Sequence, residues 1–394
     1  MIRAFAWMAV LSAGFIVYGS LFPFEPRADG ALSAAHLLAT IGHPVDSLPN
    51  LLSNIVFYMP LGVFTALACR ASRPIWQLIA ITALGAALSL TMELAQLHVA
   101  GRLSTFADIY PNTVGTFAGV VVAILVRPWA VHRGASPAGP LAPIPIFLLA
   151  VFLAYRLFPY VPSLDLHAYW RAVQPLIVAP DIRALAICRY GVMWFAVAAL
   201  LARIALPVRI PLLSLWAMGA VWAAKIVLTG SHLGASEVIG GLIALLAWQF
   251  VSRLGTRTEA GVLALALAAW IVAARLQPFI FDTQARAFGW VPFAALLNGS
   301  MSINLLSLLE KSFLYGTLMW TLVQLGMRWS IAAMGLALSL GLLGWAQTHI
   351  PGRSADITDA AIAVAMAVLL ALLARPDAMP GLQEGQPPRA DPRS

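Results

Sequence analysis

The chain has 394 residues, of which 61% are hydrophobic and only 10% are charged. Soluble domains are roughly half apolar and a quarter charged, so this composition excludes an ordinary water-soluble fold. The formal net charge is +8, but the arginines are spread along the chain and form no basic patch, so no nucleic-acid partner is expected.

Long apolar stretches recur along the whole chain. Each could cross a hydrocarbon core of about 30 Å, because a helix rises about 1.5 Å per residue. Twelve stretches lie near residues 4–22, 50–69, 75–97, 109–126, 142–159, 184–202, 211–229, 236–252, 260–276, 303–325, 330–348 and 358–375. The first stretch follows Arg3 but lacks a small-residue cleavage site, so we expect a membrane helix there. The pattern predicts an all-α, polytopic transmembrane bundle of about twelve helices embedded in a lipid bilayer.

The distribution of charge predicts an orientation. With the N-terminus inside, the inner segments carry 13 arginines and four acids, and the outer ends carry nine arginines, two lysines and 12 acids. Cytoplasmic loops of membrane proteins are enriched in Lys and Arg. We therefore expect a multi-pass protein of the bacterial inner (plasma) membrane with both termini cytoplasmic.

Three segments of the chain begin alike. They read YGSLFPF around Pro23, AYRLFPY around Pro159 and AARLQPF around Pro278. A histidine near the end of a predicted helix follows 71 to 75 residues later in each: His98, His232 and His349. Such internal repetition predicts three four-helix repeats, which are parallel because an even number of helices returns the chain to the same side.

The repeats divide the chain into 1–132, 133–255 and 256–375, followed by 376–394. The second repeat has lost the AQ and GR elements of the first and is degenerate. The last segment is rich in Pro, Gly and charge, which predicts a disordered cytoplasmic tail.

The first repeat resembles the VanZ-like family of bacterial membrane proteins. The resemblance rests on NIVFYMPLG from Asn54 to Gly62, then Glu93, Gln96, Arg102, Asp108 and the NTVG segment from Asn112 to Gly115. The third repeat is similar through Asn304, Lys311, Gln347, Arg353, Asp356 and Asp359, and departs where Gly344 stands in place of Glu93. The resemblance implies a cell-envelope protein, since the family's name member is associated with resistance to the glycopeptide antibiotic teicoplanin.

Ionisable side chains recur inside the apolar stretches. A charge at the bilayer centre costs about 2.5 to 3.5 kcal/mol on insertion scales, so such groups usually face a bundle interior or a wet cavity. The only two lysines, Lys225 and Lys311, both fall within predicted helices, and Asn54, Arg189 and Lys311 lie at similar distances after the repeat prolines. We expect these groups to converge on a cavity that opens toward the periplasm.

The predicted site has two sets of residues. The ligand-binding candidates are Asn54, Gln96, Arg102, Asn112, Lys311, Gln347, Arg353 and Asp359. Arg and Lys suit a phosphate or carboxylate, because the planar guanidinium binds such groups bidentately. The candidates for proton transfer are Glu93, Asp108, His98 and Asp356, since burial moves a carboxyl pKa toward neutrality.

Structural roles compete with each assignment. Lys311 paired with Asp356 or Glu93 would join helices, and Arg102 and Arg353 would reach lipid headgroups from the interface. The histidines would favour the helix dipole, and the prolines would stop helices. No metal site or cofactor is expected, because the chain lacks recognised ligand spacing and has no GxSxG, HExxH or P-loop motif. The cysteines, Cys69 and Cys188, are interpreted as packing residues.

These features favour a VanZ-like envelope protein that binds an anionic amphiphile, such as a lipid-linked cell-wall or polysaccharide precursor, from the periplasmic side. Whether it also modifies that ligand stays open. The alternatives are a secondary transporter or flippase, since parallel repeats also suit alternating access, and a membrane scaffold for envelope biosynthesis enzymes.

Overall fold

The structure, a computed structural model, describes residues 2–28, 32–42, 48–69, 73–133, 143–178, 180–204, 209–297 and 301–374. Within these ranges the chain is helical, and strand pairing is limited to three isolated bridges. The all-α prediction is therefore confirmed. The predicted disordered tail, 376–394, lies outside the described residues.

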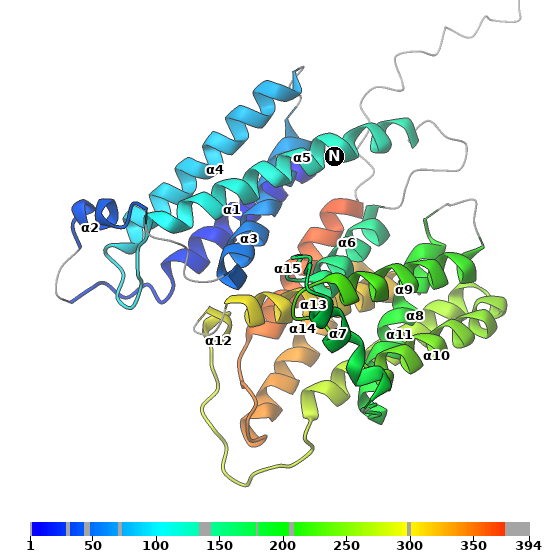
Figure 1. Ribbon diagram of the computed structural model, residues 1–394. Helices are drawn as coiled ribbons and strands as arrows, with labels where there is room; N and C mark the ends of the chain where they lie inside the picture. The colour runs from blue at the N-terminus through cyan, green and yellow to red at the C-terminus, as the bar shows by residue number, and fades with distance from the viewer. Residues whose placement is uncertain are drawn as a thin grey trace, which may run out of the picture.

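We call the segments 1–132, 133–255 and 256–375 the first, second and third units, and Figure 1 labels their helices. The first unit holds α1 (Ile2–Leu21), α2 (Ala34–Ala39), α3 (Leu48–Ala68), α4 (Pro74–Gln96) and α5 (Ile109–Arg133). The second holds α6 (Pro143–Leu157), α7 (Leu166–Ile177), α8 (Ala184–Ala202), α9 (Ile210–Val227) and α10 (Ala235–Val251). The third holds α11 (Thr256–Leu276), α12 (Ala294–Leu297), α13 (Met301–Gln324), α14 (Trp329–Ala346) and α15 (Thr358–Ala374).

Each of the twelve predicted stretches coincides with a helix, and α2, α7 and α12 are short additional helices in the connections. Among the described residues, nine helices are long and apolar enough to cross a membrane. The apolar helices α6 and α15 are shorter, and the 24-residue α13 carries Glu310 and Lys311 in its middle. The prediction of a multi-pass membrane protein is confirmed, whereas the count of twelve spans is not.

The same helix pairs pack together in all three units. In the first unit α3 contacts α1, α4 and α5, and α4 contacts α5. The corresponding contacts in the second unit join α8 to α6, α9 and α10, and α9 to α10. In the third unit α13 contacts α11, α14 and α15, and α14 contacts α15. This likeness supports three repeats, which stay a prediction.

The hydrogen bonds of the turns after the three prolines show that His232 is not equivalent to His98 and His349, although the sequence predicted this equivalence. The N–H four residues after each proline donates to a carbonyl near the end of the third long helix: Arg27 to His98 at 2.9 Å, Ser163 to Val227 at 2.8 Å and Asp282 to His349 at 2.6 Å. Val227, and not His232, therefore stands where His98 and His349 stand. His232 follows the left-handed Gly230, whereas His98 and His349 precede their left-handed glycines. The three histidines follow their prolines at nearly the same distance in the sequence. The structurally equivalent position in the second unit comes five residues before His232, because the connecting loops differ in length.

Glycines bring α3 and α5 into close contact. A Cβ added at Gly115 would lie 2.2 Å from the carbonyl oxygen of Ile55, and one added at Gly119 would lie 2.2 Å from that of Met59. Gly115 and Gly119 are four residues apart, which is the small-residue spacing that lets membrane helices approach closely. This contact holds the first unit together and positions the beginning of α5.

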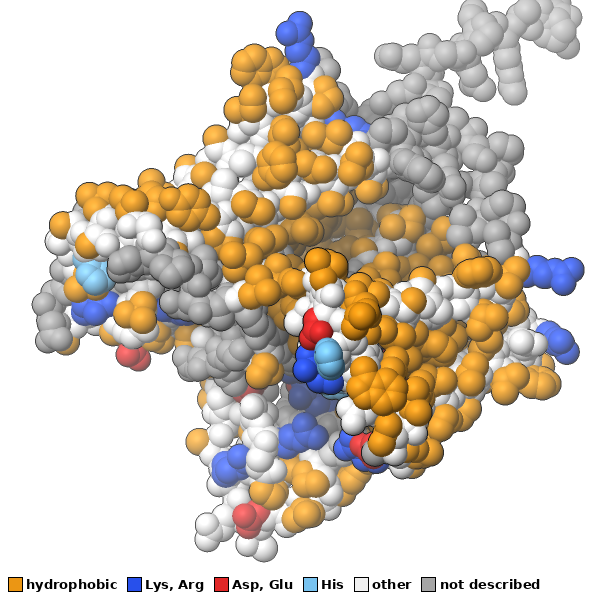
Figure 2. Space-filling view, in the orientation of Figure 1, with side chains coloured by type: hydrophobic (Ala, Val, Ile, Leu, Met, Phe, Trp, Pro, Cys, Tyr) orange, Lys and Arg blue, Asp and Glu red, His pale blue; other side chains and the backbone are white. Residues whose placement is uncertain are grey.

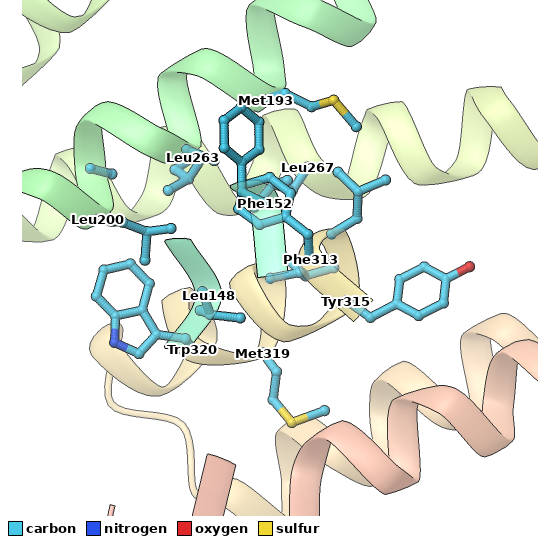
Figure 3. Packing of buried hydrophobic residues seen from close by; sticks show 14 of the residues in the cluster. Leu148, Phe152, Met193, Leu200, Leu263, Leu267, Phe313, Tyr315, Met319 and Trp320 are labelled. Carbon is cyan, nitrogen blue, oxygen red and sulfur yellow. The ribbon is translucent and has the colours of Figure 1, made fainter. Parts of the chain in front are cut away.

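The second and third units share one hydrophobic core. Figure 3 shows side chains from α6, α8, α11 and α13 meeting there. The ring of Phe152 lies 5.1 Å, between centroids, from both Trp194 and Phe313. Leu263 and Leu267 enter the same cluster from α11. The unit boundary near residue 255 therefore does not divide this core.

The first unit lies beside this bundle, as Figure 1 shows. It contacts the third unit through α3 against α13 and α1 against α15. The hydroxyl of Tyr18 donates to the carbonyl of Pro292 at 2.6 Å, and the Phe15 ring packs edge-on against Phe293 at 5.3 Å. Figure 2 shows hydrophobic side chains covering the helix flanks, with most charged groups toward the helix ends. This distribution suits helices whose flanks face lipid.

Candidate functional site

Polar side chains gather near the helix ends that carry Pro23, Pro159 and Pro278, which we call the proline end. An acid stands at the start of the last long helix in each unit: Asp108 just before α5, Glu237 in α10 and Asp359 in α15. Each acid comes six residues after the position of Arg102, Ser231 and Arg353, respectively. The three acids therefore occupy equivalent places and have different partners.

In the first unit Asp108 has an amide partner. The Asn54 side chain, from α3, donates to its Oδ1 at 3.0 Å. One turn further along α5, the Asn112 amide donates to the hydroxyl of Ser89 at 2.9 Å, and both of these side chains are buried. The structure thus brings the predicted residues Asn54 and Asp108 together and places Asn112 below them. We call Asn54, Asp108 and Asn112 the first-unit cluster.

Glu93 fastens a loop in the first unit. Its buried carboxylate accepts hydrogen bonds from the Ser104 hydroxyl at 3.1 Å and from the Thr105 backbone N–H at 2.9 Å. A buried carboxylate that accepts such bonds is stabilised where it stands. The contact holds the segment that leads into α5, and the role of Glu93 in proton transfer stays a prediction.

In the second unit two cations hold one buried carboxylate. Glu237 pairs with Arg156 from α6 and with Lys225 from α9, whose Nζ lies 2.5 Å from Oε2. The three side chains are only 7%, 8% and 1% exposed for Arg156, Lys225 and Glu237, respectively. The Arg156 guanidinium carbon also lies 5.6 Å from the ring centroid of Tyr155 and 5.2 Å from that of Tyr190. This second-unit cluster (Arg156, Lys225 and Glu237) is sealed from solvent.

The third unit has a similar set of charges in a more open form, with its lysine on the second long helix of the unit and not on the third. Asp359 pairs with Arg275 from α11 and with Lys311 from α13, whose Nζ lies 2.9 Å from Oδ1. The side chain of Lys311 is 24% exposed and that of Arg275 is 15% exposed. Arg275 also donates to the hydroxyl of Tyr315 at 3.0 Å. We call Arg275, Lys311 and Asp359 the third-unit cluster.

A further ion pair connects the second and third units. Arg189 on α8 lies 2.7 Å from the Glu310 carboxylate on α13, and its guanidinium also donates to the hydroxyl of Tyr155 at 2.5 Å. Glu310 is the neighbour of Lys311 along α13. The charged groups of the two units therefore form a nearly continuous series across the shared bundle.

Arg102 and Arg353 close the ends of helices. Arg102 donates from Nε to the carbonyl of Phe22 at 2.6 Å and from Nη2 to that of Gly19 at 2.8 Å, at the end of α1. Arg353 makes the same two bonds at the end of α11, at 2.7 and 3.1 Å. Burial lowers the pKa of both groups, and the neighbouring Arg275 lowers that of Arg353 further. These bonds satisfy carbonyls that a helix end leaves without partners.

The two predicted glutamines act in the same way. Gln96 donates to the carbonyl of Ser20 at 3.0 Å, and Gln347 donates to that of Arg275 at 2.9 Å. Each glutamine thus joins the end of the third long helix of its unit to the end of the first. Their amides contact backbone, and the third-unit cluster is held in place through Arg275.

The remaining candidates for proton transfer also contact backbone. The exposed His98 has Nδ1 3.3 Å from the carbonyl of Leu94, and His349 has Nδ1 3.1 Å from that of Asp282. Asp356 accepts from the N–H of Thr358 at 2.8 Å, at the start of α15. The structure thus places His98 and Asp356 against backbone groups, and their roles in proton transfer stay predictions.

A cleft of about 330 Å³ opens at the proline end of the first unit. It is lined by Phe22, Pro23, Glu25, Ala100, Gly101 and Arg102 of the first unit and by Leu297 of α12. Of the predicted ligand-binding residues, Arg102 alone reaches it. The cleft lies where the first unit meets the third.

The contacts place five of the twelve predicted residues in two separate clusters, three in the first unit and two in the third, and the other seven lie outside these clusters. Lys311 pairs with Asp359, and not with Asp356 or Glu93 as the structural alternative proposed. The predicted site set omitted five residues of the ion clusters whose ionisable side chains in apolar stretches were visible in the sequence: Arg156, Arg189, Lys225, Glu237 and Arg275. Within the described ranges, no group of three or more His, Cys, Asp or Glu side chains could hold a metal ion.

The comparisons with known proteins concern the first unit. Residues 5–127 match the family model described as VanZ/LLP1. The resemblance predicted for this unit is confirmed, and the weaker resemblance of the third unit stays a prediction. No curated protein and no solved structure matches the chain significantly.

Proposed function

We propose that this membrane protein, whose first unit matches the VanZ/LLP1 family, binds an anionic amphiphile at the third-unit cluster. The observation that carries the proposal is that Arg275 and Lys311 share the single carboxylate of Asp359 while both remain partly open. An anionic group of a ligand would balance the second cation.

Electrostatics favours such a ligand. In the third-unit cluster Arg275 and Asp359 lie at the ends of apolar helices and Lys311 lies in the middle of α13, where a charge without a counter-ion is costly. In a medium of low polarity, attraction between opposite charges a few ångströms apart is several times stronger than in water. Arg353 adds positive charge near Arg275, whereas the carboxylates of Asp356 and Glu310 add negative charge near Lys311. Because Glu310 is paired with Arg189, one positive charge remains in excess among Arg275, Lys311, Arg353, Asp356 and Asp359.

The second-unit cluster shows why we assign ligand binding to the cluster whose cations are more exposed. It also has two cations on one carboxylate, but the rings of Tyr155 and Tyr190 lie against Arg156 and supply negative π-faces. Its three side chains are almost fully enclosed. We therefore assign it to holding α6, α9 and α10 together, and the ligand to the third unit.

The ligand we propose has a phosphate or a carboxylate and a long apolar part. A guanidinium and an ammonium together suit a phosphate, and the hydrophobic helix flanks suit a lipid tail. A lipid-linked cell-wall or polysaccharide precursor has both features. The basic inner segments support a periplasmic proline end, a location in the inner membrane and cytoplasmic termini.

The proposal is for binding and assigns no reaction. Glu93 fastens a loop, and Asp356 caps a helix. Asp108, in the first-unit cluster with Asn54, is the remaining carboxylate of the predicted proton-transfer set. Any chemistry would therefore centre on Asp108, in the first unit.

Binding can be measured with a polyprenyl phosphate as the probe. The full chain is placed in phosphatidylcholine nanodiscs that contain the probe, and the retained probe is quantified by native mass spectrometry. Replacing one charge-assisted contact costs about 1.5 to 3 kcal/mol, so Lys311→Gln should weaken binding about tenfold or more. The matched variant Lys225→Gln, in the sealed cluster, should leave binding unchanged after correction for the folded fraction.

Equal binding by the wild-type chain and Lys311→Gln would remove this site. Loss of binding in both lysine variants would instead point to a general effect of charge. The transporter alternative predicts probe movement across proteoliposomes driven by a proton gradient. The scaffold alternative predicts a co-purified membrane enzyme that persists in Lys311→Gln.

A further inference from the structure

We propose a second ligand site in the cleft between the first unit and α12, which takes a zwitterionic lipid headgroup bearing a phosphate and a primary ammonium. The reason is that Arg102 and Glu25 present opposite charges to the same small space. This site is separate from the third-unit cluster and does not depend on the function proposed for it.

The two charges remain available to a ligand. No ion pair joins Arg102 to Glu25 in the part of the chain that the structure describes. Arg102 uses Nε and Nη2 to close α1, and among the described contacts its Nη1 has no acceptor. The side chain of the exposed Glu25 likewise makes no described hydrogen bond.

The backbone around the cleft is held in place. Ala100 donates its N–H to the carbonyl of Glu25 at 2.8 Å, and Arg27 donates to that of His98 at 2.9 Å. Pro26 and Val99 form an isolated bridge between the same two segments. Glu25 therefore projects from a fixed turn, and a ligand would meet it with little loss of chain entropy.

The pair of charges is particular to the first unit. Two residues after the proline, where the first unit has Glu25, the second has Val161 and the third has Ile280. At the place of Arg102 the second unit has Ser231 and the third has Arg353. The third unit thus keeps the arginine without an acid, and the second keeps neither charge. The turn after the proline is common to the three units, and the pair of opposite charges beside it occurs in the first unit alone.

The size and position of the cleft suit a headgroup. Its volume of about 330 Å³ is at the lower end of ligand pockets, which measure roughly 300 to 1,000 Å³. It lies at the helix ends, beside Phe22 and Leu297, where headgroups meet the first apolar atoms of a lipid. The Arg102 Nη1 would donate to the phosphate, and Glu25 would accept from the ammonium.

Three lipids distinguish the contact of Arg102 with the phosphate from the contact of Glu25 with the ammonium. Phosphatidylethanolamine has the phosphate and the primary ammonium, phosphatidylglycerol lacks the ammonium, and phosphatidylcholine has a quaternary amine that cannot donate hydrogen bonds. The full chain is released from nanodiscs containing each lipid, and the retained lipids are counted by native mass spectrometry. We expect phosphatidylethanolamine to be retained in preference to phosphatidylcholine.

The decisive variant is Glu25→Gln, because the Glu25 side chain is exposed and makes no described hydrogen bond, and the backbone bond from Ala100 to Glu25 is kept. It should lower phosphatidylethanolamine retention about tenfold, since one charge-assisted bond is lost, and leave phosphatidylglycerol retention unchanged. Ile280→Gln, the same new side chain at the equivalent place in the third unit, is the matched control and should have no effect.

Two results would overturn the proposal. One is equal retention of phosphatidylethanolamine by the wild-type chain and Glu25→Gln, and the other is retention of phosphatidylcholine at the same level. Soluble phosphoethanolamine distinguishes the source of the headgroup. Competition by it, lost in Glu25→Gln, indicates that the headgroup alone is bound, whereas a Glu25-dependent loss of lipid without competition indicates that the acyl chains are required.

Discussion

The second-unit and third-unit clusters have the same plan and different surroundings. In each, an acid in the first turn of the last helix pairs with an arginine near the end of the first helix and with a lysine. Tyrosine rings and close packing enclose Arg156 and its partners, whereas Lys311 keeps about a quarter of its side chain exposed. The enclosure of the charged side chains, and not their number or sign, therefore separates a structural ion cluster from a candidate binding site.

Removing the acid should have the largest effect and should differ between the clusters. Glu237→Gln leaves two buried cations without a carboxylate, and breaking a buried pair typically costs about 3 to 5 kcal/mol. Asp359→Asn should cost less, because water or an anion can reach Lys311. The free energy of unfolding from denaturant titration in mild detergent checks both values. Equal costs would show that exposure is not what distinguishes the clusters.

Substitution of Arg353, which binds the carbonyls at the end of α11, tests whether this residue belongs to the ligand-binding part of the third-unit cluster. Arg353→Ala removes two bonds to helix carbonyls and should lower stability by about 1.5 to 3 kcal/mol, the range for hydrogen bonds to charged groups. Arg102→Ala, which removes the matching bonds of α1, should cost a similar amount. Polyprenyl phosphate binding by folded Arg353→Ala should weaken by less than about threefold, because Arg353 contributes charge near the cluster without pairing with Asp359. A tenfold loss of binding would make Arg353 a ligand-binding residue.

The tyrosine that packs on the sealed cluster can be removed without changing any charge. Tyr190 lies over both Arg156 and Arg189, so Tyr190→Leu should destabilise the protein by about 0.5 to 2 kcal/mol. Hydrogen exchange of α6 and α8 should rise in parallel. If neither quantity changes, the ring does not compensate the second cation, and the contrast between the clusters loses its explanation.

The smallest effect is expected at a histidine. His349→Ala removes a contact with the carbonyl of Asp282 and an edge-on ring contact with the exposed Trp345, 6.2 Å away between centroids, so stability should change by no more than about 0.5 kcal/mol. Probe binding at the third-unit cluster should also be unchanged. A marked loss of function in this variant would return the histidines to the candidate site.

Much of the fold could be predicted because each helix is specified locally. The twelve apolar stretches all became helices, since a membrane-length run of apolar residues has few other stable structures in lipid. The short helices α2, α7 and α12 were not predicted, because they lie in connections without a long apolar pattern. The equivalence of His232 was wrong because loop lengths compensated for the shift in register.

The candidate site was predictable in its residue types and not in its contacts. Ionisable groups within apolar stretches stand out, so Lys311 and Asp359 were recognised. Arg102 binds the end of α1 because a turn brings it back to that helix. The Gly-Arg pair in the sequence does not predict this contact. The contact of Tyr190 with Arg156 depends on α6 lying against α8, whereas Tyr155 is the neighbour of Arg156 on α6 itself.

By itself, the sequence determined that this is a helical protein of the membrane, because hydrophobic burial and the need to satisfy backbone groups act on each stretch separately. It also determined which charges lie within the helices. Only the tertiary structure decided which cations share a carboxylate, which cluster is closed and where Glu25 meets Arg102. Those outcomes depend on distances between residues far apart in the chain, which local patterns do not specify.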